Sequence, residues 1–416
     1  MAIKKIVIAS EVIRQLPAIL KELGVSSRVL LVADTNTYQA AGRMVADILT
    51  GASFNLQECI LRRQGQLAAD EEALVEVLLN IEPETEFILA VGAGTINDIA
   101  RYTSYKTGKP YAIIATAPSM DGYASSVAAL TIKGCKKTCS ATPPVAIIGD
   151  VNILGAAPRE MILAGLGDIL GKYTSLADWQ LSHVITGEGY SDKIAGEVRE
   201  AINECVRLTG NQMDKKAIQS LMEALVTSGS AMLEWGNSRP ASGSEHHISH
   251  FLEMHDILAG TGGHLHGAKV GIAEIMVTDL YHRVFNYRLE EIKEFIARRQ
   301  PETTAAYRSR VTEAYGPLAE ELIHEMQGYY LDEARRKERQ RNILRAWEDM
   351  QLWVRHNVPL PEEIQGLLLK AGAPTSFAEL GIPAARVKTA LENAKEVRQR
   401  YTIFRLMEDI GIAIVE

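Results

Sequence analysis

The chain has 416 residues, of which 47% are hydrophobic and 23% are charged, so its length predicts about two or three domains with sizeable cores. The formal net charge is −8, and no dense run of lysine and arginine carries interleaved aromatic residues, which argues against a nucleic-acid partner. No uninterrupted apolar stretch is long enough to span a bilayer and no signal-peptide pattern opens the chain, so we expect no membrane partner and a cytoplasmic protein.

Short apolar runs alternate with helical stretches in the first third of the chain. One such helix is predicted over 71–81, where apolar residues recur with helical spacing. Runs of this kind, bounded by glycine, proline and aspartate, predict parallel strands that are buried on both faces. The runs are 29–33, 86–92, 111–116 and 145–149.

The pattern changes after Pro158. From Arg159 onward the chain offers amphipathic helical segments and no convincing strand. Strands and helices followed by helices alone indicate two domains. We therefore predict a Rossmann-like α/β nucleotide-binding domain over 1–157 and an all-α domain that binds metal and substrate over 158–416.

A glycine-rich turn is predicted between the second apolar run and the helix that follows it. Gly92 and Gly94 permit a tight turn and close approach of the backbone to a ligand. The free N–H groups at the start of the helix suit a pyrophosphate. The third glycine of the Gly-x-Gly-x-x-Gly pattern is absent, and a strand–glycine–helix turn also occurs for purely steric reasons.

Two further candidate contacts follow strands, where ligands bind in open α/β sheets. In the segment 116–123, Thr116 and Ser119 offer hydroxyl groups and Asp121 can accept from a substrate hydroxyl, although the same residues suit a simple turn. Asp34 ends the first apolar run. Its carboxylate can bind the ribose hydroxyls and favour NAD over NADP, or it can cap a helix.

Six of the ten histidines lie in one short part of the chain, 246–266. Neutral imidazoles are common ligands of catalytic metals. His250 and His266 are separated by a glycine-rich segment that can turn the chain between two helices, and Asp168 can supply a carboxylate from another helix. Two histidines and one carboxylate with vacant positions suit zinc, nickel or iron as a Lewis acid. The spacing leaves open which histidines are ligands, with His246, His247, His255 and His264 as the other candidates.

Several motifs together resemble the glycerol-1-phosphate dehydrogenase family, within the dehydroquinate synthase-like and iron-containing alcohol dehydrogenase superfamily. The Ser-Gly-Ser-Glu-His-His-x-Ser-His segment is the specific one, whereas the glycine-rich segment is shared by the superfamily. The resemblance spans nearly the whole chain in matching order. The segments that carry it are 92–98, 116–122, 167–168, 239–250, 264–270, 371–374 and 400–403.

The resemblance implies a dehydroquinate synthase-like fold and assigns roles residue by residue. The metal ligands fall on Asp168, His250 and His266, and the metal is zinc or nickel. Asp121 and Asp168 face the substrate and, with the two histidines, form the catalytic set. The contacts to NAD(H) or NADP(H) fall on Asp34, Gly94, Thr95, Ile96, Asn97, Asp98, Thr116, Ala117, Pro118, Ser119 and Ser125.

The resemblance also implies the reaction, which interconverts sn-glycerol 1-phosphate and dihydroxyacetone phosphate, in the reducing direction, in a homodimer. No motif identifies the residues that bind the phosphate. A glycerol or other small-polyol dehydrogenase is the nearest alternative function. A dehydroquinate synthase-like lyase resembles the chain less, because that family carries glutamate at the position of Asp168. A metal-dependent hydrolase and an inactive relative are the remaining alternatives.

Overall fold

The protein is described by a computed structural model that covers residues 2–26, 28–65, 67–132, 135–210, 213–260, 263–326 and 332–414. The chain forms two compact units, Met1–Ile169 with Glu200–Gly236, and Leu170–Arg199 with Asn237–Glu416. The first unit therefore includes helices that follow the boundary expected after residue 157. None of the described helices combines the length and the apolar character that a membrane crossing requires.

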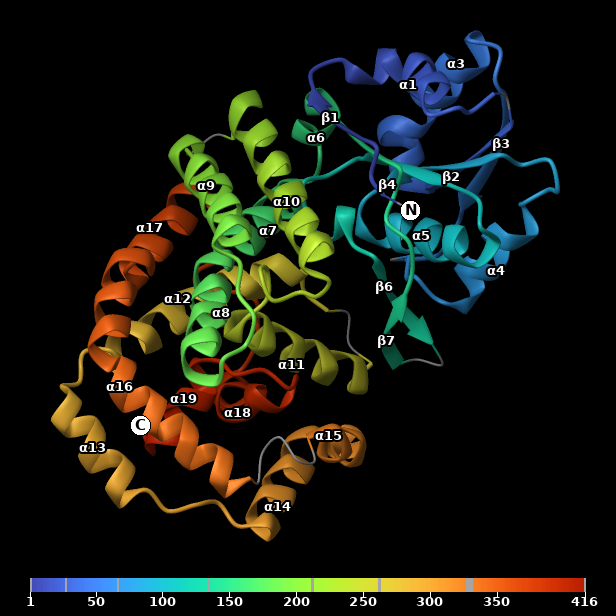
Figure 1. The fold of residues 1–416 in the computed structure, drawn as a ribbon. Helices are drawn as coiled ribbons and strands as arrows, with labels where there is room; N and C mark the ends of the chain where they lie inside the picture. Colours follow the sequence, from blue (N-terminus) through green and yellow to red (C-terminus); the bar gives the residue numbers. More distant parts are fainter. Residues whose placement is uncertain are drawn as a thin grey trace. The chain divides into compact units, whose positions relative to one another are not determined.

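A parallel sheet of six strands forms the centre of the first unit, in the order β1-β8-β5-β4-β2-β3 (Figure 1). The four inner strands are the predicted apolar runs, and β4, β5 and β8 are buried along their whole length. This confirms the prediction of parallel strands covered on both faces. The strands are β1 (Lys5–Ala9), β2 (Arg28–Asp34), β3 (Asn55–Leu61), β4 (Phe87–Gly92), β5 (Tyr111–Ala115) and β8 (Ala146–Asp150).

Helices and one hairpin complete the first unit. The hairpin pairs β6 (Val127–Ile132) with β7 (Cys135–Ser140) in antiparallel register. The helix expected over 71–81 is present as α4, which Asp70 caps through its side chain. The helices are α1 (Leu16–Glu22), α2 (Thr35–Thr37), α3 (Arg43–Gly51), α4 (Glu71–Leu79), α5 (Gly94–Thr107), α6 (Val151–Gly155), α7 (Arg159–Leu170), the second half of α9 (Asp192–Leu208) and α10 (Lys215–Trp235).

The described residues of the second unit form helices joined by loops and contain no strand, as predicted for the chain after Pro158. Its apolar core includes Phe251, Tyr281, Trp347 and Phe404, which are almost completely buried. Within this unit α11 packs against α12, and α16 packs against α8. The helices are α8 (Lys172–Thr186), α11 (Ser244–Leu258), α12 (His266–Val284), α13 (Leu289–Arg298), α14 (Thr304–Tyr315), α15 (Ala319–Met326), α16 (Glu333–Asn357), α17 (Pro361–Ala371), α18 (Ala384–Asn393) and α19 (Ile403–Ile410).

Candidate functional site

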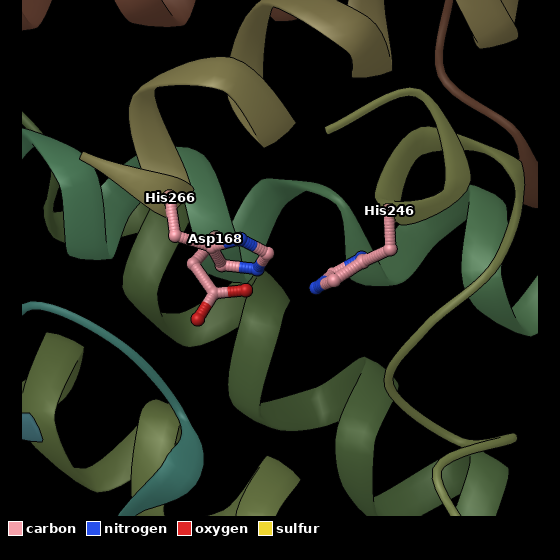
Figure 2. Close-up of side chains that lie close together, drawn as sticks. All are labelled: Asp168, His246 and His266. Atoms are coloured by element: carbon pink, nitrogen blue, oxygen red, sulfur yellow. The ribbon is translucent and has the colours of Figure 1, made fainter. Parts of the chain in front are cut away.

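Three histidines of the second unit converge at the contact between α11 and α12. His246 and His250 lie one turn apart on α11, and their ring centroids are 6.1 Å apart. His266 is the first residue of α12, and its ring centroid lies 5.1 Å from that of His246 and 5.2 Å from that of His250. Figure 2 shows the rings of His246 and His266 entering from these two helices. The two helices expected on either side of the glycine-rich segment are therefore present and pack against each other, while residues 261–262 of that segment lie outside the described residues.

Glu253 connects two of these histidines. Its Oε1 lies 2.8 Å from Nδ1 of His266, and its Oε2 lies 3.2 Å from Nδ1 of His250. A carboxylate only accepts, so each Nδ1 carries a proton, and in the neutral imidazole Nε2 then keeps its lone pair. Lys269 approaches the same carboxylate, with Nζ 3.3 Å from Oε1. Burial raises the pKa of Glu253, but His266, His250 and Lys269 outweigh this effect and hold the pKa well below its usual range.

Burial keeps His250 in the form that binds a metal. Burial lowers the pKa of His250 to about 3, although Glu253 acts in the opposite direction. The imidazole of His250 is therefore neutral near pH 7, as metal ligation requires. Ligand atoms of His250, Glu253 and His266 lie within 4.8 Å of one another, so these side chains form one group of candidate ligands.

A buried chain of acids leads away from His246. Nδ1 of His246 lies 2.6 Å from Oε1 of Glu245, and the hydroxyl of Thr174 lies 2.9 Å from Oε2 of the same carboxylate. The Thr174 hydroxyl also contacts Oε2 of Glu274. A hydroxyl has one proton to donate, so one of the two carboxyl groups must be protonated. Burial and the charge of Glu245 raise the pKa of Glu274 well above its usual range, which identifies Glu274 as the protonated acid.

The other histidines of the sequence cluster have different surroundings. His255 lies with Nε2 2.8 Å from the carbonyl oxygen of Ala314, and His264 is exposed. His247 is completely buried, and neither of its ring nitrogens has a hydrogen-bond partner among the described residues. Of the six clustered histidines, the structure therefore brings together His246, His250 and His266.

The predicted site residues Asp168 and Asp121 are joined by a hydrogen bond within the first unit. Asp168, the third side chain labelled in Figure 2, lies in the last turn of α7 and is fully buried. Its Oδ2 accepts a hydrogen bond of 2.9 Å from the backbone N–H of Asp121. Oδ2 of Asp121 in turn accepts from the hydroxyl of Ser228 on α10, at 3.0 Å. The loop after β5 is thus fixed to both α7 and α10.

The glycine-rich turn has the expected strand–turn–helix geometry. Gly92 ends β4, Gly94 begins α5, and a Cβ added to Gly94 would lie 2.8 Å from Cε of Met120. The predicted contact Asp98 forms a salt bridge of 2.8 Å with Arg101. Arg101 is almost fully buried and also donates to the carbonyl oxygens of Gly122, Tyr123 and Val127. It fastens the segment after β5 to α5.

Thr116 and Asp34 lie at the carboxyl ends of strands, whereas Ser125 precedes β6. Thr116 follows β5 and donates its backbone N–H to the carbonyl oxygen of Gly92 at 3.1 Å, while Ser125 bonds locally to Val127. Asp34 caps α2, because its Oδ1 accepts from the N–H groups of Asn36 and Thr37 at 2.7 and 2.9 Å. The capping role weighed for Asp34 is therefore present.

Two site residues escaped the sequence interpretation. Glu253 stands three residues after His250, and Arg101 stands three residues after Asp98. Both pairs have helical i,i+3 spacing, which places the two partners on the same face of a helix. This spacing was the signal in the sequence that could have identified Glu253 and Arg101. That signal is weak by itself, because charged i,i+3 pairs also occur throughout exposed helices such as α13 and α16.

Comparisons with known proteins identify relatives of the chain. The family model for iron-containing alcohol dehydrogenases matches residues 7–158. The glycerol-1-phosphate dehydrogenase of Bacillus velezensis is 38% identical over 90% of this chain and 83% of its own length. The enzyme of the same name from Halalkalibacterium halodurans is 35% identical, over 95% of this chain and 90% of its own length.

The chain belongs to the glycerol-1-phosphate dehydrogenase family. The family resemblance of the sequence is thereby confirmed. Solved structures confirm the fold class. A probable glycerol dehydrogenase from Sinorhizobium meliloti has a TM-score of 0.60 at 17% identity, covering 98% of this chain and 97% of that one. An iron-containing alcohol dehydrogenase from Corynebacterium glutamicum has a TM-score of 0.62 at 14% identity, covering 100% of this chain and 96% of that one.

Proposed function

We propose that the protein is a metal-dependent NAD(P)-linked oxidoreductase that interconverts sn-glycerol 1-phosphate and dihydroxyacetone phosphate, in the reducing direction. The observation that carries the proposal is the identity of 38% over 90% of the chain with an enzyme named for this reaction. The pair of histidines aligned by Glu253 supports it, because a site of this kind suits a Lewis-acid metal.

The proposed metal ligands are Asp168, His250 and His266, and the proposed metal is zinc or nickel. The donor set fits such an ion, since both imidazoles direct Nδ1 to Glu253, which leaves Nε2 of the neutral ring as the atom that can bind a metal. A divalent cation bound there would polarise the substrate oxygen and lower the pKa of a secondary hydroxyl. His246, whose Nδ1 proton is held by Glu245, keeps its own Nε2 beside the ring of His266.

The proposed dinucleotide contacts are Asp34, Gly94–Asp98, Thr116–Ser119 and Ser125. The start of α5 supports this assignment, because its first N–H groups are the ones that an anionic pyrophosphate needs. The backbone of Asp121 is fixed by Asp168, which supports the proposal that Asp121 faces the substrate. These residues position the cofactor and the substrate, whereas the hydride chemistry belongs to the nicotinamide.

A glycerol or small-polyol dehydrogenase is the second candidate function. It is favoured only by the fold shared with the probable glycerol dehydrogenase, and at 17% identity that likeness carries no information on the substrate. We also propose that the protein acts in the cytoplasm as a homodimer, which light scattering after size-exclusion chromatography would test for the oligomeric state.

The test is NADH oxidation with dihydroxyacetone phosphate, measured before and after exhaustive chelation and after nickel or zinc is returned. We expect activity to disappear with the chelator and to return with the metal. His250→Ala and His266→Ala should abolish metal-restored activity, whereas His356→Ala, an exposed histidine on α16, serves as the matched control. Activity that survives complete metal removal, or a wild-type protein that does not oxidise NADH, would overturn the proposal.

A further inference from the structure

Two arginines of the second unit lie on the segment between α18 and α19, and neither forms a salt bridge with a carboxylate of the described residues. Arg398 donates from Nη1 to the hydroxyl of Ser238 at 2.8 Å, and Arg400 donates from Nη2 to the same oxygen at 2.7 Å. Arg400 also donates from Nη1 to the carbonyl oxygen of Ser242 at 2.7 Å. One neutral serine hydroxyl therefore accepts from both guanidinium groups.

The neighbouring Arg239, by contrast, has its positive charge neutralised by a carboxylate. It pairs with Glu188 through two hydrogen bonds, of 2.8 and 2.5 Å. Within the described ranges no carboxylate forms a salt bridge with Arg398 or Arg400. Glu188 and Glu245 raise the pKa of Arg400 through their charges but form no salt bridge with it. Partly buried charges are ordinarily paired, so two adjacent cations without an acid leave room for an external anion.

The hydrogen bonds of these arginines lead to the start of α11. Arg400 binds the carbonyl oxygen of Ser242, two residues before the first residue of that helix, and α18, which precedes the arginines, packs against α11. Burial, Arg398 and Arg239 lower the pKa of Arg400 to about 9, so the two cations repel each other in partly buried surroundings. The arginine pair therefore lies beside the helix that carries the proposed metal ligand His250.

We propose that Arg398 and Arg400 bind the phosphate monoester of the substrate and determine the preference for phosphorylated over unphosphorylated trioses. The proposal rests on the function proposed above and names the residues that the motifs left unassigned. Planar guanidinium groups offer paired N–H donors that match phosphate oxygens. The phosphate dianion of the substrate would supply the missing negative charge. The three-carbon chain of the substrate would extend from the phosphate toward the histidines of α11. The net charge of −8 makes such a local positive pocket necessary.

The experiment compares kcat/KM for dihydroxyacetone phosphate with kcat/KM for dihydroxyacetone in the metal-loaded protein. For Arg398→Met and Arg400→Met we expect the ratio of these two constants to fall by at least about tenfold each, since hydrogen bonds to charged groups are the strong ones. Arg398→Lys should fall between the wild type and Arg398→Met, because lysine keeps the charge without the planar fork. Arg355→Met, an exposed arginine of α16, is the matched control and should leave the ratio unchanged.

The ratio separates phosphate binding from a structural role. Arginines that merely hold Ser238 in place would lower both constants together, and an unchanged ratio overturns the proposal. Inorganic phosphate should inhibit the wild type and inhibit Arg398→Met more weakly. The ratio of KM for NADPH to KM for NADH distinguishes the other phosphate source. A change confined to that ratio would assign the arginines to the 2′-phosphate of NADP and would equally overturn the proposal.

A failure of the proposed function gives a different result from a failure of this inference. If the wild type reduces neither substrate, calorimetry with dihydroxyacetone phosphate alone still tests the arginines. Binding by the wild type that weakens at least about tenfold in Arg398→Met would support them. Equal binding by the two proteins would overturn the inference. Among the residues that the structure describes, Arg398 makes a single side-chain hydrogen bond, so its variants are the ones expected to fold even where Arg400→Met does not.

Discussion

Glu253 determines which nitrogen of two histidines is available to a metal. The neighbouring carboxylate fixes both imidazoles in the same tautomer, with Nδ1 of each directed to a different oxygen of Glu253. Carboxylates in this position orient ligands and make them more basic, and their loss typically costs about 10- to 100-fold in metal affinity. Glu253→Gln can accept through one oxygen only and presents an N–H₂ group to the second imidazole, so we expect a loss of that size.

The measurement is a titration of the metal-free protein with Co²⁺, followed through its visible absorption. It needs no substrate and reports affinity and ligand geometry separately from activity. Glu362→Gln, which removes an exposed carboxylate from α17, is the matched control. A Glu253→Gln protein with the wild-type affinity and the wild-type spectrum would show that the carboxylate does not orient the ligands.

Single residues of the site differ in how visible they were in the sequence. The histidines were conspicuous because six of ten fall in 21 positions, 246–266, and a local excess needs no fold to be seen. Glu253 was obscured by the many other helical i,i+3 charged pairs of the chain. Arg398 lies more than 150 positions after Ser238, so only the folded chain shows that it binds a hydroxyl there and lacks an acid. Sequence order contains no information on such distant contacts.

At the scale of elements, the loop after β5 depends on two glycines in the helices beneath it. A Cβ added to Gly165 of α7 would lie 1.8 Å from the carbonyl oxygen of Pro118, and one added to Gly229 of α10 would lie 2.4 Å from that of Asp121. Both obstacles are backbone atoms, so the loop itself would have to move. We expect Gly165→Ala to lower the free energy of unfolding by about 1–3 kcal/mol, the usual cost of overpacking.

The same substitution should raise KM for NADH, because the displaced loop carries the proposed contacts Thr116–Ser119. Urea unfolding and steady-state kinetics are the two measurements. Gly196→Ala is the control, since nothing lies within 4 Å of a Cβ at that position of α9 and alanine is a better helix former by about 1 kcal/mol. A Gly165→Ala protein as stable as the wild type would contradict the close approach of loop and helix.

The strands show why some elements were predicted and others were not. The inner strands β4, β5 and β8 are buried along their whole length and appear in the sequence as continuous apolar runs. The edge strand β1 contains only four consecutive apolar residues, and the edge strand β3 mixes exposed, partly buried and buried positions, so neither shows the long buried run of the inner strands. The hairpin of β6 and β7 lies outside the main sheet, and the first four residues of β6 alternate between exposed and buried positions. Strands that are buried on both faces are therefore the ones that a single sequence predicts most readily.

At the scale of the whole molecule, the chain order and the spatial grouping differ. The expected boundary after residue 157 separates strands from helices by composition, whereas the structure groups Glu200–Gly236 with the sheet-containing unit. The reason is that α10 packs against α6 and β1, elements that precede it by many residues. An amphipathic helix shows that it must cover an apolar surface but does not show which one. The order of strands and helices along the chain therefore predicts an α/β unit and an all-α unit. It does not show that a later segment, Glu200–Gly236, belongs to the α/β unit.

The stability of the second unit should depend on pH through Asp178. This buried carboxylate joins four elements of the unit, because it accepts from Tyr281 at 2.6 Å, from the N–H of Ile403 at 2.7 Å and from the N–H and hydroxyl of Ser244 at 2.7 and 2.8 Å. Burial and the charge of Glu245 nevertheless raise its pKa from the ordinary 3.8 to about 6. Between about pH 4 and pH 6, Asp178 is therefore protonated in the folded chain but ionised in the unfolded chain.

A raised folded-state pKa contributes stability that is complete below about pH 4 and is lost as the pH rises through 6. The free energy of unfolding of the wild type, minus that of Asp178→Asn, should therefore fall by about 3 kcal/mol between pH 4 and pH 7 and then become flat. Urea unfolding at intervals across this range measures the difference, and Asp349→Asn, at an exposed position of α16, controls for the change in net charge. A difference that rises with pH would mean that the four donors outweigh burial and hold Asp178 ionised, so that the α8–α11–α12–α19 junction is maintained by a buried anion.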